Sequence, residues 1–394
     1  MRICYIVQSR NHFASTFVDY FARRGHEIHL ISFTPEPLSN AVNHHPLAHD
    51  GQSAGKVLAY VGAIPAVRRM VRRIAPDLVH AHFLTSNGLV AAMTGFHPLV
   101  VSAHGSDVHR SMARPLRRKL IQFVMRRADL VHTVSRDLAI NVASLGVPTE
   151  KTVALSQGVE VARFAEPRAR RTDGLVHIIC TRTLQSPYQP HTIVEALHQL
   201  AGAGVSFRMT FAARGRDEEA VRRHVGERGL ADRVDFLGGY DLEALPRLLA
   251  GADVYVSAAL WDGTSLSLLE AMAAGAFPVV TDCPANREWL AERDAGLFFP
   301  AEDADTLAQR LATAVASPEL RDAAAERNRR KVAEDGDRER NLGLLADYYE
   351  RLVGKREEGG VIAAARRNPD RDRGSTREGR AARAHGAATE GGRP

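Results

Sequence analysis

Cysteine is scarce in this sequence of 394 residues. The three cysteines, Cys4, Cys180 and Cys283, lie far apart, and the first two fall within apolar runs that are typical of buried strands. Their spacing indicates neither a disulfide framework nor a structural metal site. We therefore expect a fold that forms without cross-links and without a metal ion.

The sequence also lacks a long apolar run. No uninterrupted stretch approaches the roughly 20 residues that a helix needs to cross a bilayer. Residues 1–7 enter a strand at once and do not have the layout of a signal peptide. These absences favour a cytoplasmic protein, and a chain of this length is expected to form about two domains.

Charge of one sign is only slightly in excess, and most of that excess lies at the C-terminus. The net charge is +6, and residues 355–394 hold ten Lys/Arg against six Asp/Glu, which leaves about +2 for the rest. This segment is rich in Arg, Gly and Ala and contains no aromatic residue, so we expect a disordered tail. A solvated extension is favoured over a binding arm for nucleic acid or anionic lipid.

Strand-like and helix-like segments alternate in two halves of the chain, which indicates parallel sheets with helices on both faces. The polar run 167–174 breaks the alternation and is a candidate linker. We expect Rossmann-like domains at 1–166 and 175–335. A terminal helix at 336–354 either packs back on the first domain or closes its own, and the tail follows from 355.

The most informative segment runs from Asp262 to Glu270. Asp262 ends a strand-like run, and Glu270 lies inside an apolar helix whose N-cap is Thr264 or Ser265. Free N–H groups at the start of such a helix bind anions, while carboxylates accept hydrogen bonds from sugar hydroxyls. The alternative is an ordinary strand–turn–helix unit with a solvated Glu, and spacing alone does not decide between them.

Two further residues follow expected strand ends, where parallel sheets bind ligands. His104 follows the strand 99–103 and can donate a hydrogen bond to a substrate oxygen, with Asp107 orienting a neighbour. Arg182 follows the strand 176–181 and is a natural clamp for a diphosphate. The alternatives are a polar loop and a surface arginine.

Two other patterns remain open. His80 and His82 flank Ala81 like a pair of metal ligands, but no third ligand follows at the right spacing, so metal binding is disfavoured. Residues 67–74 and 110–127 are basic and amphipathic, which is typical of helices that lie on anionic lipid. The alternative for the second segment is that its apolar side chains face the core (Leu116, Leu120, Phe123 and Val124).

Several short motifs occur in order along residues 1–353. They lie at 25–28, 76–82, 104–107, 135, 146–151, 157–164 and 234–238, and they end with the Asp262–Glu270 spacing followed by 271–275 and 278–280. Their number, order and spacing make the chain resemble retaining nucleotide-sugar glycosyltransferases of the GT-B fold, in the large group often called family 4. The resemblance implies two Rossmann-like, doubly wound domains facing across a cleft.

The resemblance implies how a nucleotide-sugar donor is held. Glu270 is expected to bind the ribose hydroxyls, and the backbone near the helix start is expected to hold the sugar and phosphates (Gly263, Thr264, Ser265 and Leu266). The family has a phosphate-binding Lys where this sequence has Tyr188, which offers only a neutral hydrogen bond.

The resemblance also implies the catalytic groups. Asp262 is expected to contact the donor sugar, His104 to lie beside the transferred sugar, and Arg182 to balance the charge of the leaving diphosphate. Catalysis is then mainly positioning and electrostatic stabilisation, with no metal or other cofactor. Asp262 stands where the family has Glu, one methylene longer.

The acceptor, a glycan or a lipid-linked molecule, is expected to contact the first domain. There Gln8 begins a segment that replaces the family's glycine-rich loop, and Arg10 restores a positive charge near the acceptor, with Asp107 on the same side. The first interpretation is transfer of a hexose or related sugar, with peripheral attachment to the inner face of an anionic membrane. Alternatives are a weak or inactive nucleotide-sugar-binding relative and a nucleotide-sugar 2-epimerase; nucleic-acid binding ranks last.

Overall fold

A computed structural model describes residues 1–8, 12–35, 42–47, 56–165, 174–292 and 294–367. Residues Met1–Asp347 form one compact unit that contains two separate parallel β-sheets, and a second unit begins at Tyr348. The expectation of two parallel-sheet, Rossmann-like domains is confirmed. Of the expected linker, only Gly174 lies within the described residues.

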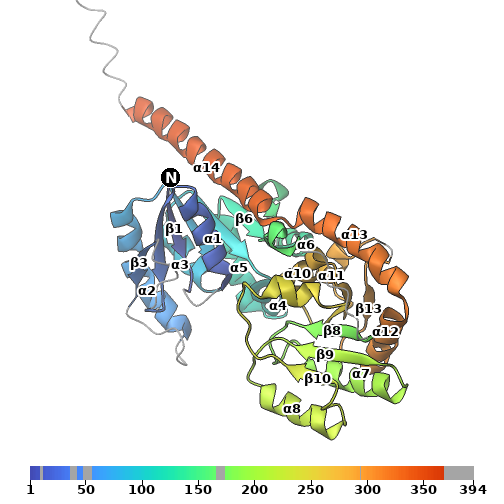
Figure 1. Cartoon of the computed structure of the whole chain (residues 1–394). Helices are drawn as coiled ribbons and strands as arrows, with labels where there is room; N and C mark the ends of the chain where they lie inside the picture. Colours follow the sequence, from blue (N-terminus) through green and yellow to red (C-terminus); the bar gives the residue numbers. More distant parts are fainter. Residues whose placement is uncertain (9–11, 36–41, 48–55, 166–173, 293, 368–394) are drawn as a thin grey trace, which may run out of the picture. The chain divides into compact units, whose positions relative to one another are not determined.

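The N-terminal sheet has seven parallel strands (Figure 1). In spatial order they are β3 (Asn43–Pro46), β2 (Glu27–Ser32), β1 (Arg2–Ile6), β4 (Leu78–His82), β5 (Leu99–Ala103), β6 (Leu130–Thr133) and β7 (Thr152–Ala154). Every residue of β4 and β5 is buried, as expected for central strands of a sheet with helices on both faces.

Six α-helices accompany this sheet in the described part of the chain: α1 (His12–Arg23), α2 (Lys56–Ile74), α3 (Asn87–Thr94), α4 (Ser106–Met112), α5 (Pro115–Arg127) and α6 (Arg136–Ser144). Because side chains alternate along a strand, β4 places side chains on both faces of the sheet. Val79 and Ala81 join the apolar core that includes side chains of α2, α3 and α5. His80 and His82 instead meet Phe17 of α1.

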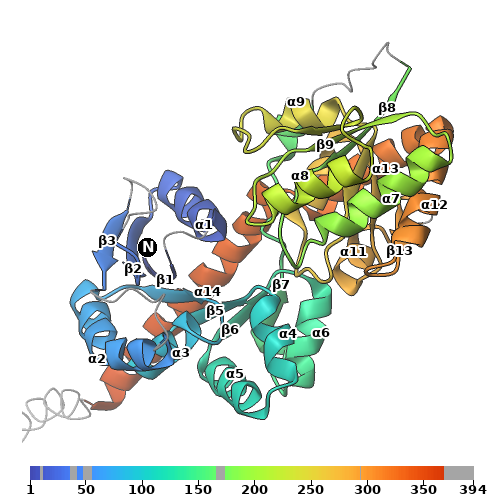
Figure 2. The same ribbon diagram turned by 90° about the horizontal axis from the view of Figure 1, so that it is seen from below.

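The C-terminal sheet has six parallel strands, in the order β10 (Val234–Phe236), β9 (Phe207–Phe211), β8 (Val176–Cys180), β11 (Val254–Ser257), β12 (Phe277–Thr281) and β13 (Leu297–Phe299). One face packs against α7 (Pro190–Gly202), α8 (Glu218–Glu227) and α12 (Ala304–Ala316). Figure 2 shows α7 and α8 side by side on it. The other carries α9 (Leu245–Ala250) and α10 (Leu266–Ala274).

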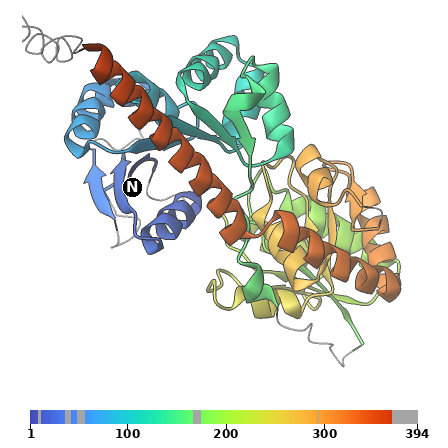
Figure 3. The ribbon, with the colours of Figure 1, turned by 90° about the horizontal axis from the view of Figure 1, so that it is seen from above.

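The remaining elements are α11 (Pro284–Trp289), α13 (Pro318–Asp335), α14 (Arg338–Arg367) and two short 3₁₀ turns, η1 (Thr149–Lys151) and η2 (Val161–Phe164). Figures 1 and 3 show α14 as an uninterrupted helix. It continues beyond the expected end at 354 as far as Arg367, and the rest of the expected tail lies outside the described residues. Alanine, arginine, lysine and glutamate favour helix there and outweigh Gly359 and Gly360.

Some elements were not expected from the sequence. β3 has no apolar pattern, β7 and β13 are three residues long, and α13 is strongly polar. None of the described helices combines the length and apolar character that a membrane span requires.

Candidate active site

Two oppositely charged side chains meet at the carboxyl edge of the C-terminal sheet. Arg182 follows β8 and Asp262 follows β11, and these strands are hydrogen-bonded neighbours. Parallel neighbours end at the same edge, so the fold itself brings both side chains together. Nη2 of Arg182 lies 2.8 Å from Oδ2 of Asp262, and both side chains are largely buried.

The start of α10 lies beside this ion pair. Ser265 is the N-cap: its side-chain oxygen accepts from the N–H of Leu268 at 3.3 Å. Nη1 of Arg182 donates to the hydroxyls of Ser265 and Ser267, each at 3.0 Å. The N–H groups of Leu266 and Ser267 have no recorded acceptor among the described residues, as expected in the first helical turn. These donors and the guanidinium make an edge suited to an anion.

Tyr188 supports Arg182 rather than replacing a second cation. The guanidinium carbon lies 4.2 Å from the centre of the Tyr188 ring, in a cation–π arrangement. Burial lowers the pKa of Arg182, but the charge of the Asp262 carboxylate and the phenolic oxygen of Tyr255 outweigh this effect. The pKa of Arg182 is therefore raised. The arginine is therefore a fixed positive charge.

Glu270 lies one turn further along α10 and is partly buried. Burial raises its pKa to about 7, although the positive charges of Arg338, Arg163 and Arg182 act in the opposite direction. The structure records no hydrogen bond or ion pair for this carboxylate among the described residues. A carboxylate held at such cost without a partner is typical of a functional site.

His104 follows β5 and packs against two rings. Its Nε2 lies 3.0 Å from Nδ1 of His82, and the two imidazoles stack with centroids 5.2 Å apart. The centroid of the Phe83 ring lies 4.6 Å from that of the His104 ring. Burial, and secondarily the charge of His132, lowers the pKa of His104 to about 3, so this imidazole is neutral at physiological pH.

Asp107 shapes the turn that carries His104. Its carboxylate accepts hydrogen bonds from the backbone N–H groups of Leu84, His104, Gly105 and Val108, at 2.9 to 3.1 Å. Burial raises the pKa of Asp107, against the lowering effect of these donors. The side chain therefore orders the backbone turn that carries His104.

The turn with His104 touches the turn with Asp262 through backbone atoms. A Cβ on Gly263 would overlap the carbonyl oxygen of His104, and a Cβ on Gly105 would lie 3.0 Å from Cα of Gly263. Nearby, the hydroxyl of Thr264 donates to the carbonyl of Val134. The structure thus brings His104, Arg182, Asp262 and the start of α10 together.

His80 and His82 are not arranged as a metal pair. Their rings stack with centroids 4.4 Å apart, and Nε2 of His80 is instead 2.6 Å from the hydroxyl of Ser102. That hydroxyl is 2.7 Å from Nδ1 of His132, whose Nε2 is 2.8 Å from the carbonyl oxygen of Leu155. Within the described ranges, no group of three or more His, Cys, Asp or Glu is placed to hold a metal ion.

Other predicted residues lie elsewhere or outside the described chain. Arg10 is outside the described residues. In α5, Ile121 and Val124 are buried, but Leu116 is 82% exposed, so the expectation that Leu116 faces the core is wrong. Leu116 lies in the first turn of α5, whereas the buried residues Ile121 and Val124 lie further along the helix.

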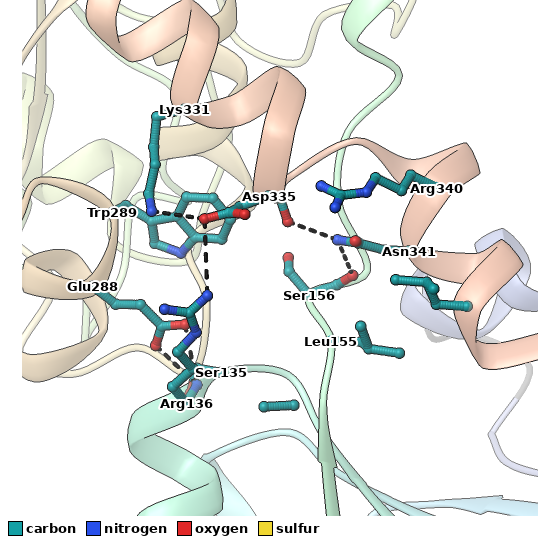
Figure 4. Close-up of a pocket in the computed structure, with 12 residues that line it drawn as sticks. Ser135, Arg136, Leu155, Ser156, Glu288, Trp289, Lys331, Asp335, Arg340 and Asn341 are labelled. Atoms are coloured by element: carbon teal, nitrogen blue, oxygen red, sulfur yellow. Dashed lines mark hydrogen bonds and ion pairs between the residues drawn. The ribbon is translucent and has the colours of Figure 1, made fainter. Parts of the chain in front are cut away.

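A separate cavity of about 130 Å³ is lined by none of the predicted site residues (Figure 4). There the carboxylate of Glu288 accepts from the backbone N–H of Arg136 at 2.9 and 3.1 Å, and thereby caps the start of α6. Lys331 pairs with Asp335 at 2.7 Å in the same place. These contacts satisfy local charges and define no cradle for a nucleotide.

Four residues of the site were not predicted. Ser267 bonds to Arg182 and accepts from the hydroxyl of Tyr255 at 2.9 Å. Tyr240 lies near enough to Glu270 for that charge to contribute, after burial, to raising its pKa to about 12. His82 holds His104. Their positions follow from tertiary packing; the only sequence signal was that Ser267 precedes Glu270 by three residues, close to one helical turn.

Anion donors and a partly buried carboxylate on a Rossmann-like domain define a nucleotide-binding type of site. The family model for glycosyl transferases group 1 matches residues 167–331, and the model for glycosyl transferase 4-like proteins matches residues 2–135. The chain belongs to the group 1 glycosyltransferases, as its motifs led us to expect.

Individual relatives agree with this family. The chain is 30% identical over 216 residues to the putative colanic acid biosynthesis glycosyltransferase WcaL of Escherichia coli, covering 53% of each chain. It is 28% identical over 327 residues to the phosphatidyl-myo-inositol mannosyltransferase of Mycolicibacterium smegmatis, covering 75% of this chain and 78% of that protein. The chain thus spans about half the length of the first relative.

Solved structures show the same fold. The structure of Anabaena HepE in complex with UDP superposes with a TM-score of 0.74 at 17% identity, covering 89% of this chain and all of that one. At this identity the likeness concerns the fold alone, which is GT-B.

Proposed function

We propose that this protein transfers a sugar from a nucleoside-diphosphate sugar to a glycan or lipid-linked acceptor. We further propose that the sugar is a hexose or related sugar, that its anomeric configuration is retained, and that no metal ion is needed. Support comes from the family, from the mannosyltransferase relative named above and from the UDP that HepE binds.

One observation carries the proposal: a single short helix, α10, presents both halves of a nucleotide-binding site. Its first turn offers N–H groups and the serines that hold Arg182, while Glu270 stands one turn further along; among the described residues neither these N–H groups nor the Glu270 carboxylate has a recorded partner. The first half suits a diphosphate and the second suits ribose hydroxyls. The spacing between them is fixed by the helix.

The charges suit cleavage of the bond between the sugar and the diphosphate. Negative charge develops on the leaving diphosphate, and Arg182 is already oriented by Asp262 and Tyr188 to stabilise it. The neutral imidazole of His104 can hydrogen-bond to the sugar without adding a charge beside the oxocarbenium-like centre. With Arg182 and N–H groups neutralising the diphosphate, a metal ion has no required role in this proposal.

Incubation of the full chain with radiolabelled nucleotide sugars in EDTA tests the proposal. We expect release of nucleoside diphosphate and labelled sugar, or transfer to an added acceptor, from one donor of the panel. Glu270→Ala should lose most of this turnover because the ribose contact is removed. Glu227→Ala, which changes an exposed glutamate of α8, is the matched control and should retain it.

The alternatives give different products. A nucleotide-sugar 2-epimerase yields an intact epimer of the donor, which chromatography separates. An inactive relative binds the donor and consumes none of it, and either result would overturn the proposed transfer. An NMR spectrum of the product's anomeric proton tests retention, and activity that returns only with a divalent cation contradicts metal independence.

We propose that the protein acts in the cytoplasm, with the acceptor held by the N-terminal domain and with peripheral contact to the anionic inner face of a membrane. The first turn of α5 supports this contact. Leu116 is exposed among Arg114, Arg117, Arg118 and Lys119, and such a mixture of apolar and basic side chains suits an anionic lipid surface.

A further inference from the structure

A cavity of about 250 Å³ lies in the N-terminal domain at the carboxyl edge of its sheet. Its lining comes from segments that follow β1, β4 and β5, represented by Gln8, Asn87 and Asp107. Asp107 also orders the turn of His104, so the cavity adjoins the candidate active site. This edge is where parallel sheets place their ligands.

The charge lining the cavity is positive. Arg110 and Arg117 both line it, and the structure records no ion pair for either among the described residues. Asp107 is a lining carboxylate as well, but its oxygens are occupied by four backbone N–H groups. Two unpaired guanidinium groups beside an occupied carboxylate favour a ligand with negative charge.

Asn87, one of the lining residues, is buried and has an acceptor without a recorded partner in the described part of the chain. Asn87 is 1% exposed, and its Nδ2 donates to the carbonyl of His82 at 2.9 Å. A carbonyl only accepts, so the amide orientation is fixed and Oδ1 faces away from His82. Oδ1 has no hydrogen-bond partner in the described part of the chain. A buried acceptor without a partner costs stability, so this wall of the cavity is held at some cost.

An exposed leucine directly precedes one of the lining arginines. Leu116 precedes Arg117 on α5 and is 82% exposed. A ligand that contacts both residues must present an apolar chain next to its anionic group. A free sugar phosphate has no such chain, whereas a phosphate attached to a lipid has one.

We propose that this cavity binds the phosphate or diphosphate of a lipid-linked acceptor. In this arrangement Arg110 and Arg117 bind the phosphate oxygens, and Leu116 contacts the start of the lipid. The inference rests on the proposed function, because it specifies the acceptor of the same reaction.

Calorimetric titration of the full chain with geranyl diphosphate tests the proposal. The affinity of the chain for a nucleoside diphosphate is measured first. Geranyl diphosphate is then titrated in the presence of saturating nucleoside diphosphate, so that the donor site is already occupied. The double variant Arg110→Gln/Arg117→Gln should bind geranyl diphosphate at least about tenfold more weakly, because two charge-assisted contacts are lost. Arg114→Gln/Arg118→Gln removes two charges at the start of α5 that do not line the cavity, and should retain affinity.

Two further arms identify the source of the anion. Leu116→Gln should weaken geranyl diphosphate but not inorganic diphosphate, and the wild-type chain should bind geranyl diphosphate more tightly. Equal affinity for the two ligands would overturn the lipid-linked acceptor, and equal losses in the two double variants would overturn the cavity as its site. The affinity for nucleoside diphosphate should be unchanged in every variant. If the wild-type chain does not bind nucleoside diphosphate, that result contradicts the proposed function rather than the acceptor site.

Discussion

Replacing Glu270 by glutamine should make the fold more stable and donor binding weaker. The pKa of this carboxyl is about 7 in the folded chain, against 4.5 for the unperturbed group, because burial disfavours its charge. Below pH 4.5 both states are protonated and the effect vanishes. As pH rises through 7 the folded state must carry a partly buried charge, which costs about 3 kcal/mol at pH 8. Glutamine has the same shape and no such cost.

Donor binding, unlike stability, should be favoured by the ionised form of Glu270. If ribose hydroxyls bind the ionised carboxylate, the ionised fraction rises from about one tenth at pH 6 to about nine tenths at pH 8. The affinity of the wild-type chain for a nucleotide sugar should then rise up to about tenfold over this range. The diphosphate of a nucleotide sugar has no ionisation there, so the affinity of Glu270→Gln should be lower and independent of pH.

Urea denaturation and calorimetric titration at pH 5, 6, 7 and 8 measure the two effects. Glu227→Gln, at an exposed position of α8, is the control and should change neither. If the variant and the wild-type chain have the same stability at every pH, the carboxylate is not held at a cost. If their donor affinities have the same pH dependence, Glu270 is not the group that accepts from the nucleotide.

Two other predictions concern the neighbouring elements. Gly263→Ala should destabilise the chain by about 1–3 kcal/mol and reduce turnover, because the new Cβ meets the carbonyl of His104; Gly226→Ala, where a Cβ meets nothing within 4 Å, should do neither in thermal unfolding and transfer assays. Burial lowers the pKa of His132 to about 4, so acid favours the unfolded state, in which this imidazole is protonated more easily. Between pH 7 and pH 4.5 the His132→Gln variant should therefore lose about 2 kcal/mol less stability than the wild-type chain, measured by urea denaturation. Equal pH profiles of the two chains would contradict this.

The buried parallel strands could be predicted from the sequence because they are short apolar runs between turn residues. β5, for example, matches its expected bounds, Leu99–Ala103. The edge strand β3 could not be predicted, since Asn43–Pro46 is polar and pairs with β2 alone. α3 has apolar residues on most sides, so its helical period is hidden, and α4 resembles a polar loop.

The candidate site was predictable where it depends on strand ends. Arg182 and Asp262 follow adjacent strands, and the N-cap Ser265 has an ordinary sequence signal. The stacking of Tyr188 on Arg182 was not predictable, because it depends on the path of a loop, and the sequence alone suggested a weakened phosphate site. Which side chain would hold His104 was equally hidden, because β4 and β5 pair only in the folded sheet.

The hydrogen bonds beneath His104 run in one direction. The carbonyl of Leu155 can only accept, so His132 carries its proton on Nε2; as a neutral ring it then accepts from the hydroxyl of Ser102, which in turn accepts from Nε2 of His80. One backbone oxygen thereby selects the tautomers of two imidazoles and the rotamer of the hydroxyl between them. No group in this hydrogen-bond chain can change its donor or acceptor role alone, so the buried chain has a fixed direction. Nitrogen-15 NMR spectra should therefore find His80 and His132 each in a single tautomer.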